Sequence, residues 1–258
     1  MDNYEKIIGY IVSSTGIDYE HVKYDIELTN LIKILFTNAS VRNNLRLFGG
    51  TAINRGFLLE KQRLSTDLDM DVVGISLEDA YNSIKEALVG YNISDYDIMS
   101  ENDEPRHVVF YADRGVTKPM KIELLIQDLD FEKEELVLHP LLEYFGFPVD
   151  LSVKVLSYRL EGLLARKFKA FYERTLYRDL YDMYFSITKI TDPNLFKKYV
   201  EEASDGSYTY ESYKAFLKSL KPAEISRQGE GLDDTYKVQL KYRLPPRSML
   251  NYVIAMMP

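Results

Sequence analysis

Residues 67–72 read DLDMDV and alternate strictly between a carboxylate and an apolar side chain. This alternation is typical of a β-strand that places one face on a core and the other in a polar space. Asp67, Asp69 and Asp71 would therefore project from the same face. Carboxylates held a few ångströms apart repel one another unless a cation lies among them. The segment predicts a strand whose acidic face either binds a cation or is exposed to solvent.

A short apolar run just upstream, LRLF, stops at Gly49 and Gly50, and the stretch after it, TAINRGFLLEK, has helical spacing. A strand that turns into a helix in this way presents backbone N–H groups at the positive end of the helix. Glycine lets a phosphate come close, and the Thr51 hydroxyl adds a hydrogen-bond donor. The turn therefore predicts a phosphate-binding site.

Three kinds of site compete for the acidic strand. The aspartates, together with Glu78, fall at the first, third, fifth and twelfth places of a calcium loop, but the sixth place is Val72 where such loops need glycine. An exposed edge strand would need no ion at all. Two fixed carboxylates also suit Mg²⁺ or Mn²⁺, which bind hard oxygen ligands, phosphate and water. The phosphate site upstream favours this third interpretation.

Hydrophobic spacing predicts an α+β chain in two parts, with a boundary near 145–150. Residues 1–147 are expected to form an α/β domain with a mixed sheet, and residues 148–258 a mainly helical domain. The pattern loosens over 127–152 and is strongly helical from about 150 to 189. The other expected helices are 4–13, 19–37, 77–90 and 208–222, and the other expected strands are 91–99, 106–113, 120–126 and 236–244.

Composition limits the class of protein. The chain has no cysteine, which excludes disulfides, thiolate zinc sites and cysteine nucleophiles. No apolar run is long enough to span a membrane and the N-terminus lacks a signal-peptide pattern, so a cytoplasmic protein without a membrane partner is expected. The net charge of −8 argues against a surface that is basic throughout. Residues 151–178 nevertheless carry seven Lys or Arg and two Glu, an excess of +5 that is compatible either with an RNA backbone or with a solvated helix face.

The segments FGGTAINRGF and RLSTDLDMD together resemble the nucleotidyltransferase superfamily of polymerase beta and the CCA-adding enzymes. More closely, they are similar to the AbiEii-type family of bacterial abortive-infection and toxin nucleotidyltransferases. VKYDIELTNLIKIL is similar to the N-terminal helix of that family, and LLARKFKAFYERTLYRDLYDMY to its helical motif. The resemblance covers roughly residues 20–190. It implies a nucleotidyltransferase-like α/β domain followed by helices.

The resemblance also implies roles for single residues. Lys167 would contact phosphate oxygens, and Asp179 would accept a proton or position a base or hydroxyl. Glu123, in the strand MKIELLI, lies where the superfamily often has a third carboxylate, although a cross-strand partner of a basic residue would fit the alternation equally well. The implied metal ligands are Asp67, Asp69 and Glu123, and the implied nucleotide-binding residues are Gly49, Gly50, Thr51, Arg63, Ser65 and Arg166. Arg178, Tyr181 and Asp182 are expected to form a structural network.

The activity implied is Mg²⁺-dependent transfer of a nucleotide from an NTP to an acceptor hydroxyl. The biology implied is the toxin of a toxin–antitoxin or phage-defence pair, with a cognate antitoxin and with RNA, such as the 3′ end of tRNA, as acceptor. Two alternatives remain at this point. The chain could nucleotidylate or phosphorylate a protein such as its antitoxin, or it could be a catalytically silent interaction module.

Overall fold

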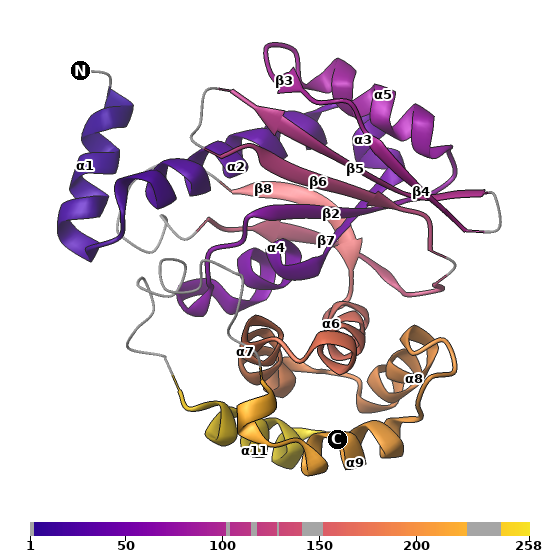
Figure 1. The fold of residues 1–258 in the computed structure, drawn as a ribbon. Helices are drawn as coiled ribbons and strands as arrows, with labels where there is room; N and C mark the ends of the chain where they lie inside the picture. The colour runs from indigo at the N-terminus through magenta and orange to yellow at the C-terminus, as the bar shows by residue number, and fades with distance from the viewer. Residues whose placement is uncertain (1–2, 102–103, 115–117, 128, 141–151, 226–243) are drawn as a thin grey trace.

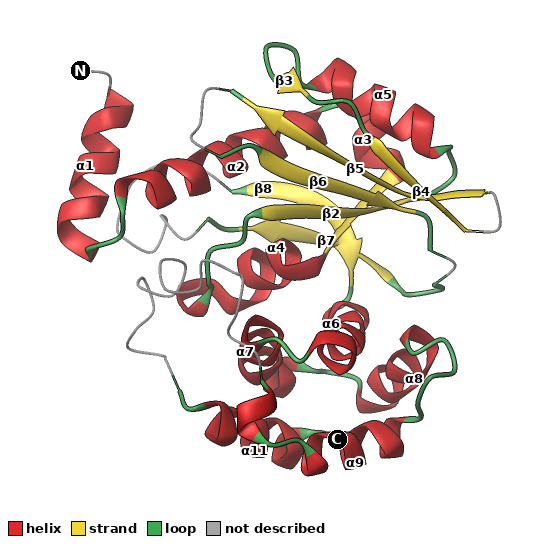
Figure 2. Cartoon of the chain, viewed as in Figure 1, coloured by secondary structure: helices red, strands yellow, loops and turns green. Residues whose placement is uncertain are grey.

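The computed structural model describes all residues except 1–2, 102–103, 115–117, 128, 141–151 and 226–243. A half that contains the β-sheets lies against a half built from helices (Figure 1; Figure 2). This is the α+β arrangement that the hydrophobic spacing predicts. Within the described residues, no helix combines the length and the apolar character that crossing a membrane requires.

The main sheet is mixed, and the acidic strand lies inside it. Over the described residues its six strands have the order β1-β2-β6-β5-β3, with β4 paired to β5. Strand β2 is antiparallel to β1 and parallel to β6. Leu68 and Met70 on β2 are completely buried, as the alternation predicts. The strands are β1 (Leu45–Phe48), β2 (Asp67–Val72), β3 (Asn92–Ile93), β4 (Asp97–Glu101), β5 (Glu104–Asp113) and β6 (Met120–Leu125).

Helices cover both faces of this sheet. Figure 1 shows α2 (Tyr19–Thr37), α3 (Ala39–Asn44) and α5 (Leu77–Ala87) along one side, and α4 (Gly49–Ile53) on the other side, next to the helical half. Helix α1 (Asn3–Thr15) packs on α2 through a small separate apolar cluster and extends away from the sheet (Figure 1). The predicted helices at 4–13, 19–37 and 77–90 are therefore confirmed.

The helix expected after the glycines forms, but its winding changes along its length. It begins at Gly49, continues as a π-helix over Asn54–Leu58 and ends as a 3₁₀ turn over Leu59–Lys61. A π-helix carries one more residue per hydrogen-bonded turn than an α-helix, and short π segments are frequent near functional sites. Periodicity alone cannot predict this change because the apolar positions are compatible with either winding.

Two strands correct the sequence interpretation of residues 127–158. Strand β7 (Lys133–Leu138) lies in the stretch where the pattern loosens, and β8 (Val153–Tyr158) lies where a helix is expected. They pair as an antiparallel hairpin, and the Ser157 hydroxyl donates to the Leu47 carbonyl oxygen of β1. The hairpin therefore packs against the sheet-containing half, although β8 follows the predicted domain boundary. That boundary itself, and nearly all of the predicted strand at 236–244, lie outside the described residues.

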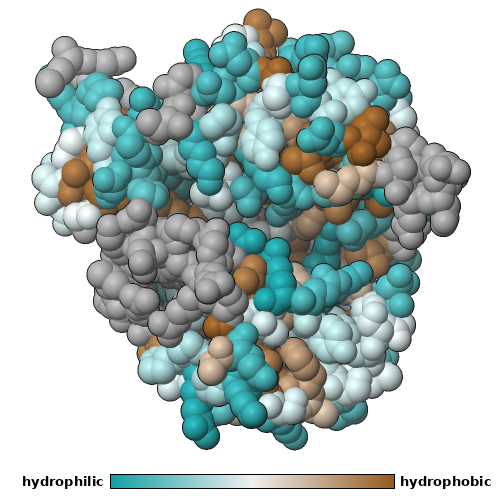
Figure 3. Space-filling view, in the orientation of Figure 1, coloured by the Kyte–Doolittle hydropathy of each residue, from teal (hydrophilic) through white to brown (hydrophobic). Residues whose placement is uncertain are grey.

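The helical half continues the core of the sheet-containing half. One cluster of buried apolar residues runs from α2 and the sheet into the helical half, where aromatic rings such as the stacked Phe168 and Tyr213 fill it. Helix α9 confirms the helix predicted at 208–222. On the face drawn in Figure 3, hydrophilic side chains predominate around small apolar patches. The helices are α6 (Leu160–Arg174), α7 (Tyr177–Ser186), α8 (Pro193–Ala203), α9 (Tyr210–Ser219) and α11 (Pro246–Met256).

Candidate active site

The turn between β1 and α4 needs glycine at two successive positions. Gly49 has a φ of +74°, a conformation that side chains disfavour. A Cβ atom on Gly49 would lie 2.0 Å from Oδ2 of Asp69, and one on Gly50 would lie 2.5 Å from Nη2 of Arg63. The predicted phosphate turn therefore lies directly against the predicted metal-binding aspartate.

Asp67 and Asp69 reach the same side of β2, at the edge of this turn. Both are partly exposed, whereas the residues between and after them, Leu68 and Met70, are buried. In the sheet register, Asp69 lies between Phe48 of β1 and Glu123 of β6. The alternation predicted from the sequence thus holds, and the Asp69 carboxylate lies against the glycine turn.

Asp69 has an environment that disfavours its negative charge. Burial raises the pKa of its carboxyl to about 6, and the neighbouring Glu123 and Asp67 add to the rise, while Lys167 and Arg166 oppose it. The balance indicates that the surroundings of Asp69 hold less positive charge than the neighbouring carboxylates need. A divalent cation would supply that charge and displace the proton.

The donor set fits Mg²⁺ better than a metal held by protein groups alone. In the part of the chain that the structure describes, no group of three or more His, Cys, Asp or Glu is arranged to hold a metal ion. Asp67 and Asp69 are therefore the pair of candidate ligands, and a third ligand at Glu123 stays a prediction. Mg²⁺ is commonly bound in this way, with water and substrate phosphates completing its octahedron.

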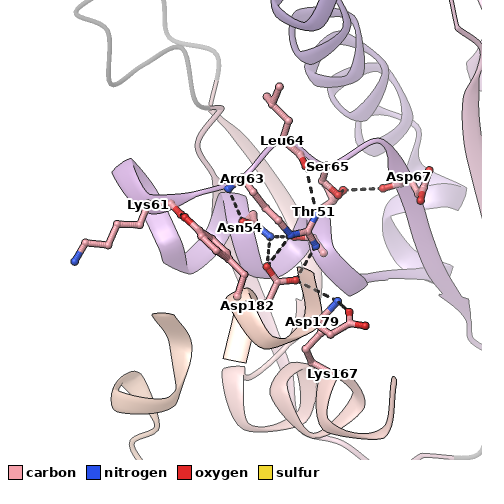
Figure 4. Close-up of polar contacts among 12 residues, drawn as sticks. Thr51, Asn54, Lys61, Arg63, Leu64, Ser65, Asp67, Lys167, Asp179 and Asp182 are labelled. Atoms are coloured by element: carbon pink, nitrogen blue, oxygen red, sulfur yellow. Dashed lines mark hydrogen bonds and ion pairs between the residues drawn. The ribbon is translucent and has the colours of Figure 1, made fainter. Parts of the chain in front are cut away.

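Thr51 and Ser65 hold the turn to the segment that leads into β2. The Thr51 hydroxyl lies 2.7 Å from the carbonyl oxygen of Asp67 and 2.8 Å from the Ser65 hydroxyl, and Thr51 is fully buried (Figure 4). Both residues stand beside the glycine turn, as predicted. Their hydrogen bonds fix the turn relative to Asp67, whatever further contact they make with a nucleotide.

Lys167 and Asp179 meet at the junction of α6 and α7. The Lys167 ammonium lies 2.9 Å from Oδ1 of Asp179 and 3.2 Å from Oδ2 of Asp182 (Figure 4). Burial opposes the charged form of Asp179, but Lys167 and Arg174 outweigh it and hold the pKa of this carboxyl far below its usual range. A carboxylate that stays ionised to such low pH is a weak proton acceptor, so of the two predicted roles positioning is favoured.

The two halves of the motif therefore converge. Helix α6, which carries Lys167, packs against α4, which begins at the glycine turn. The positive charge of Lys167 lowers the pKa of Asp69, so the lysine is near enough to influence the carboxylate beside the turn. Glycine turn, acidic strand and helical lysine come from three separate segments of the sequence and are brought near one another in the fold.

Comparisons with known proteins agree with this geometry. The family model described as "Nucleotidyl transferase AbiEii toxin, Type IV TA system" matches residues 33–247. The chain belongs to this family. The AbiEii-type resemblance predicted from the motifs is thereby confirmed, and the chain is a nucleotidyltransferase.

Two solved structures share the fold of this AbiEii family member. MenT4, a nucleotidyltransferase toxin from Mycobacterium tuberculosis H37Rv, is 14% identical with a TM-score of 0.61, and the match covers 98% of each chain. JHP933 from Helicobacter pylori is 16% identical with a TM-score of 0.52, and the match covers 93% of this chain and 91% of that one. A search of curated proteins by sequence gave no match.

Two arginines of this AbiEii-type site already have carboxylate partners. Arg63 binds Asp182 through Nε at 2.9 Å and Nη2 at 2.7 Å. Arg166 pairs with Asp71, and its guanidinium lies 3.3 Å from the centre of the Phe48 ring. Contact of either arginine with a nucleotide stays a prediction. Asp71 itself lies beyond the pair of metal-binding candidates and is buried in this ion pair.

Glu123 is the register partner of Asp69 but also has partners of its own. Its carboxylate pairs with Lys121 and lies 3.0 Å from Nε2 of His107. Both alternatives from the sequence therefore stay open. Glu123 is near enough to influence Asp69, and it also pairs with Lys121 of its own strand and with His107 of the neighbouring strand β5.

The sequence interpretation missed Asn54 and underestimated Asp182. Asn54 is fully buried and donates to the Asp182 carboxylate, 128 residues later in the chain. A single asparagine in a helical stretch carries no local pattern that could reveal so distant a partner. The RDLYD segment did point to Asp182 as part of a structural network. Asp182 does lie in a buried polar network, with Asn54, Arg63 and Lys167, whereas the Tyr181 hydroxyl donates elsewhere, to the Lys61 carbonyl oxygen.

Proposed function

We propose that this nucleotidyltransferase binds an NTP with Mg²⁺ at Asp67 and Asp69 and transfers a nucleotide to an RNA hydroxyl, with the 3′ end of tRNA as first candidate. The observation that carries the proposal is the contact between the Gly49 turn and Asp69, whose raised pKa marks a pocket short of positive charge. Mn²⁺ has the same ligand preferences and is expected to replace Mg²⁺.

The reaction is a displacement at phosphorus. The acceptor oxygen forms a bond to the α-phosphorus, the bond from that phosphorus to the bridging oxygen breaks, pyrophosphate leaves, and the hydroxyl proton passes to solvent. Bound Mg²⁺ supplies Lewis-acid stabilisation of the negative charge that develops on the phosphates. Asp67 and Asp69 hold the ion, and the backbone N–H groups after Gly49 face the phosphates.

Lys167 supplies the remaining positive charge. A lysine ammonium is a compact cation that suits phosphate oxygens. Its two carboxylate partners, Asp179 and Asp182, keep it oriented. As pyrophosphate leaves, a fixed cation of this kind stabilises the leaving group without needing to reorganise.

The RNA acceptor rests on the kinship with CCA-adding enzymes rather than on a basic surface. In the structure, most of the cations of residues 151–178 are matched by carboxylates: Lys154 with Glu135, Arg159 with Glu132, Arg166 with Asp71, and both Lys167 and Arg174 with Asp179. The excess of +5 therefore does not form an open basic path. This observation favours a second candidate, in which a protein hydroxyl accepts the nucleotide.

The proposal includes a cognate antitoxin that counters the activity, as expected of a toxin from a type IV toxin–antitoxin family. It also places the protein in the cytoplasm, where NTPs, Mg²⁺ and tRNA occur together. The silent-module alternative is disfavoured, because the family to which the chain belongs is one of nucleotidyltransferases.

A labelling experiment tests the proposal. The protein is incubated with each α-³²P-labelled NTP, Mg²⁺ and total RNA, and RNA and protein are separated by gel electrophoresis. Label on RNA of tRNA size is expected, and label on protein would instead support the second candidate. Asp69→Asn is expected to abolish labelling, whereas Asp205→Asn, at an exposed position in the helical half, is the matched control. Full labelling by Asp69→Asn would reject the site.

A further inference from the structure

Asp182 lies behind the site, in the middle of a buried polar cluster between the glycine turn and α7 (Figure 4). Its side chain is completely buried. Its Oδ1 accepts hydrogen bonds from Asn54 Nδ2 at 3.0 Å and from Arg63 Nε at 2.9 Å. Its Oδ2 accepts from Arg63 Nη2 at 2.7 Å and lies 3.2 Å from Lys167 Nζ. Four donors thus converge on one carboxylate.

Asn54 and Arg63 connect this carboxylate to the glycine turn. Asn54 Nδ2 also donates to the Gly50 carbonyl oxygen at 2.8 Å, and Asn54 Oδ1 accepts from the Arg63 backbone N–H at 2.8 Å. The Arg63 guanidinium lies against Gly50, as the 2.5 Å approach of a Cβ at that position shows. A shift of the Asp182 side chain would therefore move Asn54 and Arg63, and with them the glycine turn.

Lys167 is the connection on the other side. Its ammonium has two anionic partners, Asp179 and Asp182, and these carboxylates differ in the other residues that bind them. Asp179 is also bound by Arg174, at 2.8 and 2.9 Å, on the outer side of the helical half. Asp182 is bound by the residues of the turn. The lysine is thus held between a carboxylate that Arg174 binds and one that Asn54 and Arg63 connect to the turn.

The charge of Asp182 is permanent under ordinary conditions. Burial disfavours its ionised form, but Arg63 and Lys167 outweigh this and hold the pKa of the carboxyl below its usual range. A buried, ionised carboxylate restricts the positions of the groups that donate to it, here the side chains of Asn54, Arg63 and Lys167.

We propose that Asp182 is a positioning residue that sets the separation between the Gly49–Gly50 turn and the ammonium of Lys167. The inference rests on the proposed function, because that separation matters only if the turn and the lysine bind the same triphosphate. Asp182 has no exposed surface and does not touch the nucleotide. Without its charge, Lys167 would shift toward Asp179 and away from the phosphates.

Asp182→Asn is the direct test, since asparagine keeps the shape and one acceptor oxygen but loses the charge. We expect kcat for nucleotide transfer to fall by a factor on the order of 30–100, with the KM for NTP changed less than about threefold. In a Lys167→Met background, the same substitution should cost almost nothing further, because it acts through the lysine. Losses that multiply fully in the double variant would overturn the proposal.

Glu161→Gln is the matched control. Glu161 is also a buried carboxylate of the helical half, but its partners include Thr191 and the backbone of Asp192, remote from the turn. The Glu161→Gln substitution should lower the melting temperature and leave kcat within about twofold of wild type. An equal fall of kcat in Glu161→Gln would mean that general destabilisation explains the effect of Asp182→Asn.

Asn54→Ala keeps the proposal testable if Asp182→Asn does not fold. It removes the hydrogen bonds that Asn54 donates to the Asp182 carboxylate and to the Gly50 carbonyl oxygen, but leaves both ion pairs of Asp182. A fall in kcat of about tenfold is expected, and an unchanged kcat would contradict the proposal.

A crystal structure of whichever variant folds separates this inference from the proposed function. The turn and the Lys167 ammonium should move apart, which requires no activity. An unchanged separation would overturn the inference alone, whereas absence of nucleotide transfer by the wild-type protein would overturn the proposed function alone.

Discussion

Asp69 combines three neighbours that determine its chemistry: a glycine turn that leaves room for it, a second aspartate, and a lysine from another segment. Its pKa of about 6 shows that the negative neighbours and burial outweigh the positive ones. Such a group exchanges its proton for a metal ion readily. The same imbalance has a measurable consequence for stability.

Asp69→Asn is expected to stabilise the metal-free protein at neutral pH by about 1–3 kcal/mol. The folded pKa is raised above the unfolded value, so the native state binds more protons and wild-type stability falls as pH rises from about 4 to about 6. Asparagine does not titrate. Urea unfolding in EDTA should therefore show no advantage for the variant near pH 4 and a full advantage above about pH 6.

Mg²⁺ provides the control for this prediction. It should raise the stability of the wild-type protein at pH 7 and leave Asp69→Asn unchanged, because ligand binding to the native state stabilises it. A stability difference that does not vary with pH would show that Asp69 is not the titrating group.

Gly49→Ala is expected to abolish activity, with a loss of at least about a hundredfold, because the new methyl group would overlap the Asp69 carboxylate. Gly206→Ala is a matched control: Gly206 has a φ of +79°, and a Cβ there would meet nothing within 4 Å. Both variants should lose about 1–2 kcal/mol of stability from backbone strain. Nucleotide transfer by Gly206→Ala at the wild-type rate, beside an inactive Gly49→Ala, is the predicted pattern. Wild-type activity in Gly49→Ala would contradict the close approach.

At the level of elements, α6 is fastened to the centre of the sheet. Arg166 pairs with the buried Asp71 of β2, and the hydroxyl of Tyr158 at the end of β8 donates to the same carboxylate at 2.7 Å. Lys167 is the next residue, so the contact that anchors the helix also places the lysine. Strand β2 thus has two roles: Asp67 and Asp69 belong to the candidate site, and Asp71 anchors α6.

Arg166→Ala is therefore expected to destabilise the protein by about 3–5 kcal/mol, because it leaves the Asp71 carboxylate buried without its cation. Lys154→Ala, which breaks the exposed pair with Glu135 on the neighbouring hairpin, should cost less than about 1 kcal/mol. Chemical denaturation of the two variants beside wild type measures the difference. Equal losses would mean that Arg166 does not anchor the helix.

The elements that could be predicted from sequence are those whose pattern is local. The alternation of β2, the glycines before α4 and the helical spacing of α2 each reflect neighbours within a few residues. Strand β8 cannot be told from helix by its pattern, because the strongly helical α6 follows it almost directly. The Asn54–Asp182 contact could not be predicted, since it depends on how segments 128 residues apart are brought together.

At the scale of the whole molecule, a single apolar cluster passes from the sheet-containing half into the helical half. The residues of the site bridge the same boundary, with the turn and the acids on one side and Lys167 on the other. The two predicted domains are thus joined both by their core and by their chemistry. On unfolding, the candidate site and the two halves of the fold are expected to be lost in the same transition.

Thermal unfolding should accordingly be one cooperative transition. Differential scanning calorimetry of the full chain is expected to give a ratio of calorimetric to van't Hoff enthalpy close to 1. Arg166→Ala should lower the melting temperature without splitting the transition. Two resolved transitions, with the site lost at the lower one, would indicate that the halves fold independently.

The central claim is that two aspartates hold a divalent ion against a glycine turn, within reach of a lysine from α6. The most direct measurement is a crystal structure with Mn²⁺ and a non-hydrolysable NTP analogue, with Mn²⁺ located by its anomalous scattering. The account predicts one strong peak between the carboxylates of Asp67 and Asp69, with phosphates over Gly49 and Gly50 and next to the Lys167 ammonium. A peak elsewhere, or a triphosphate bound away from this turn, would contradict it.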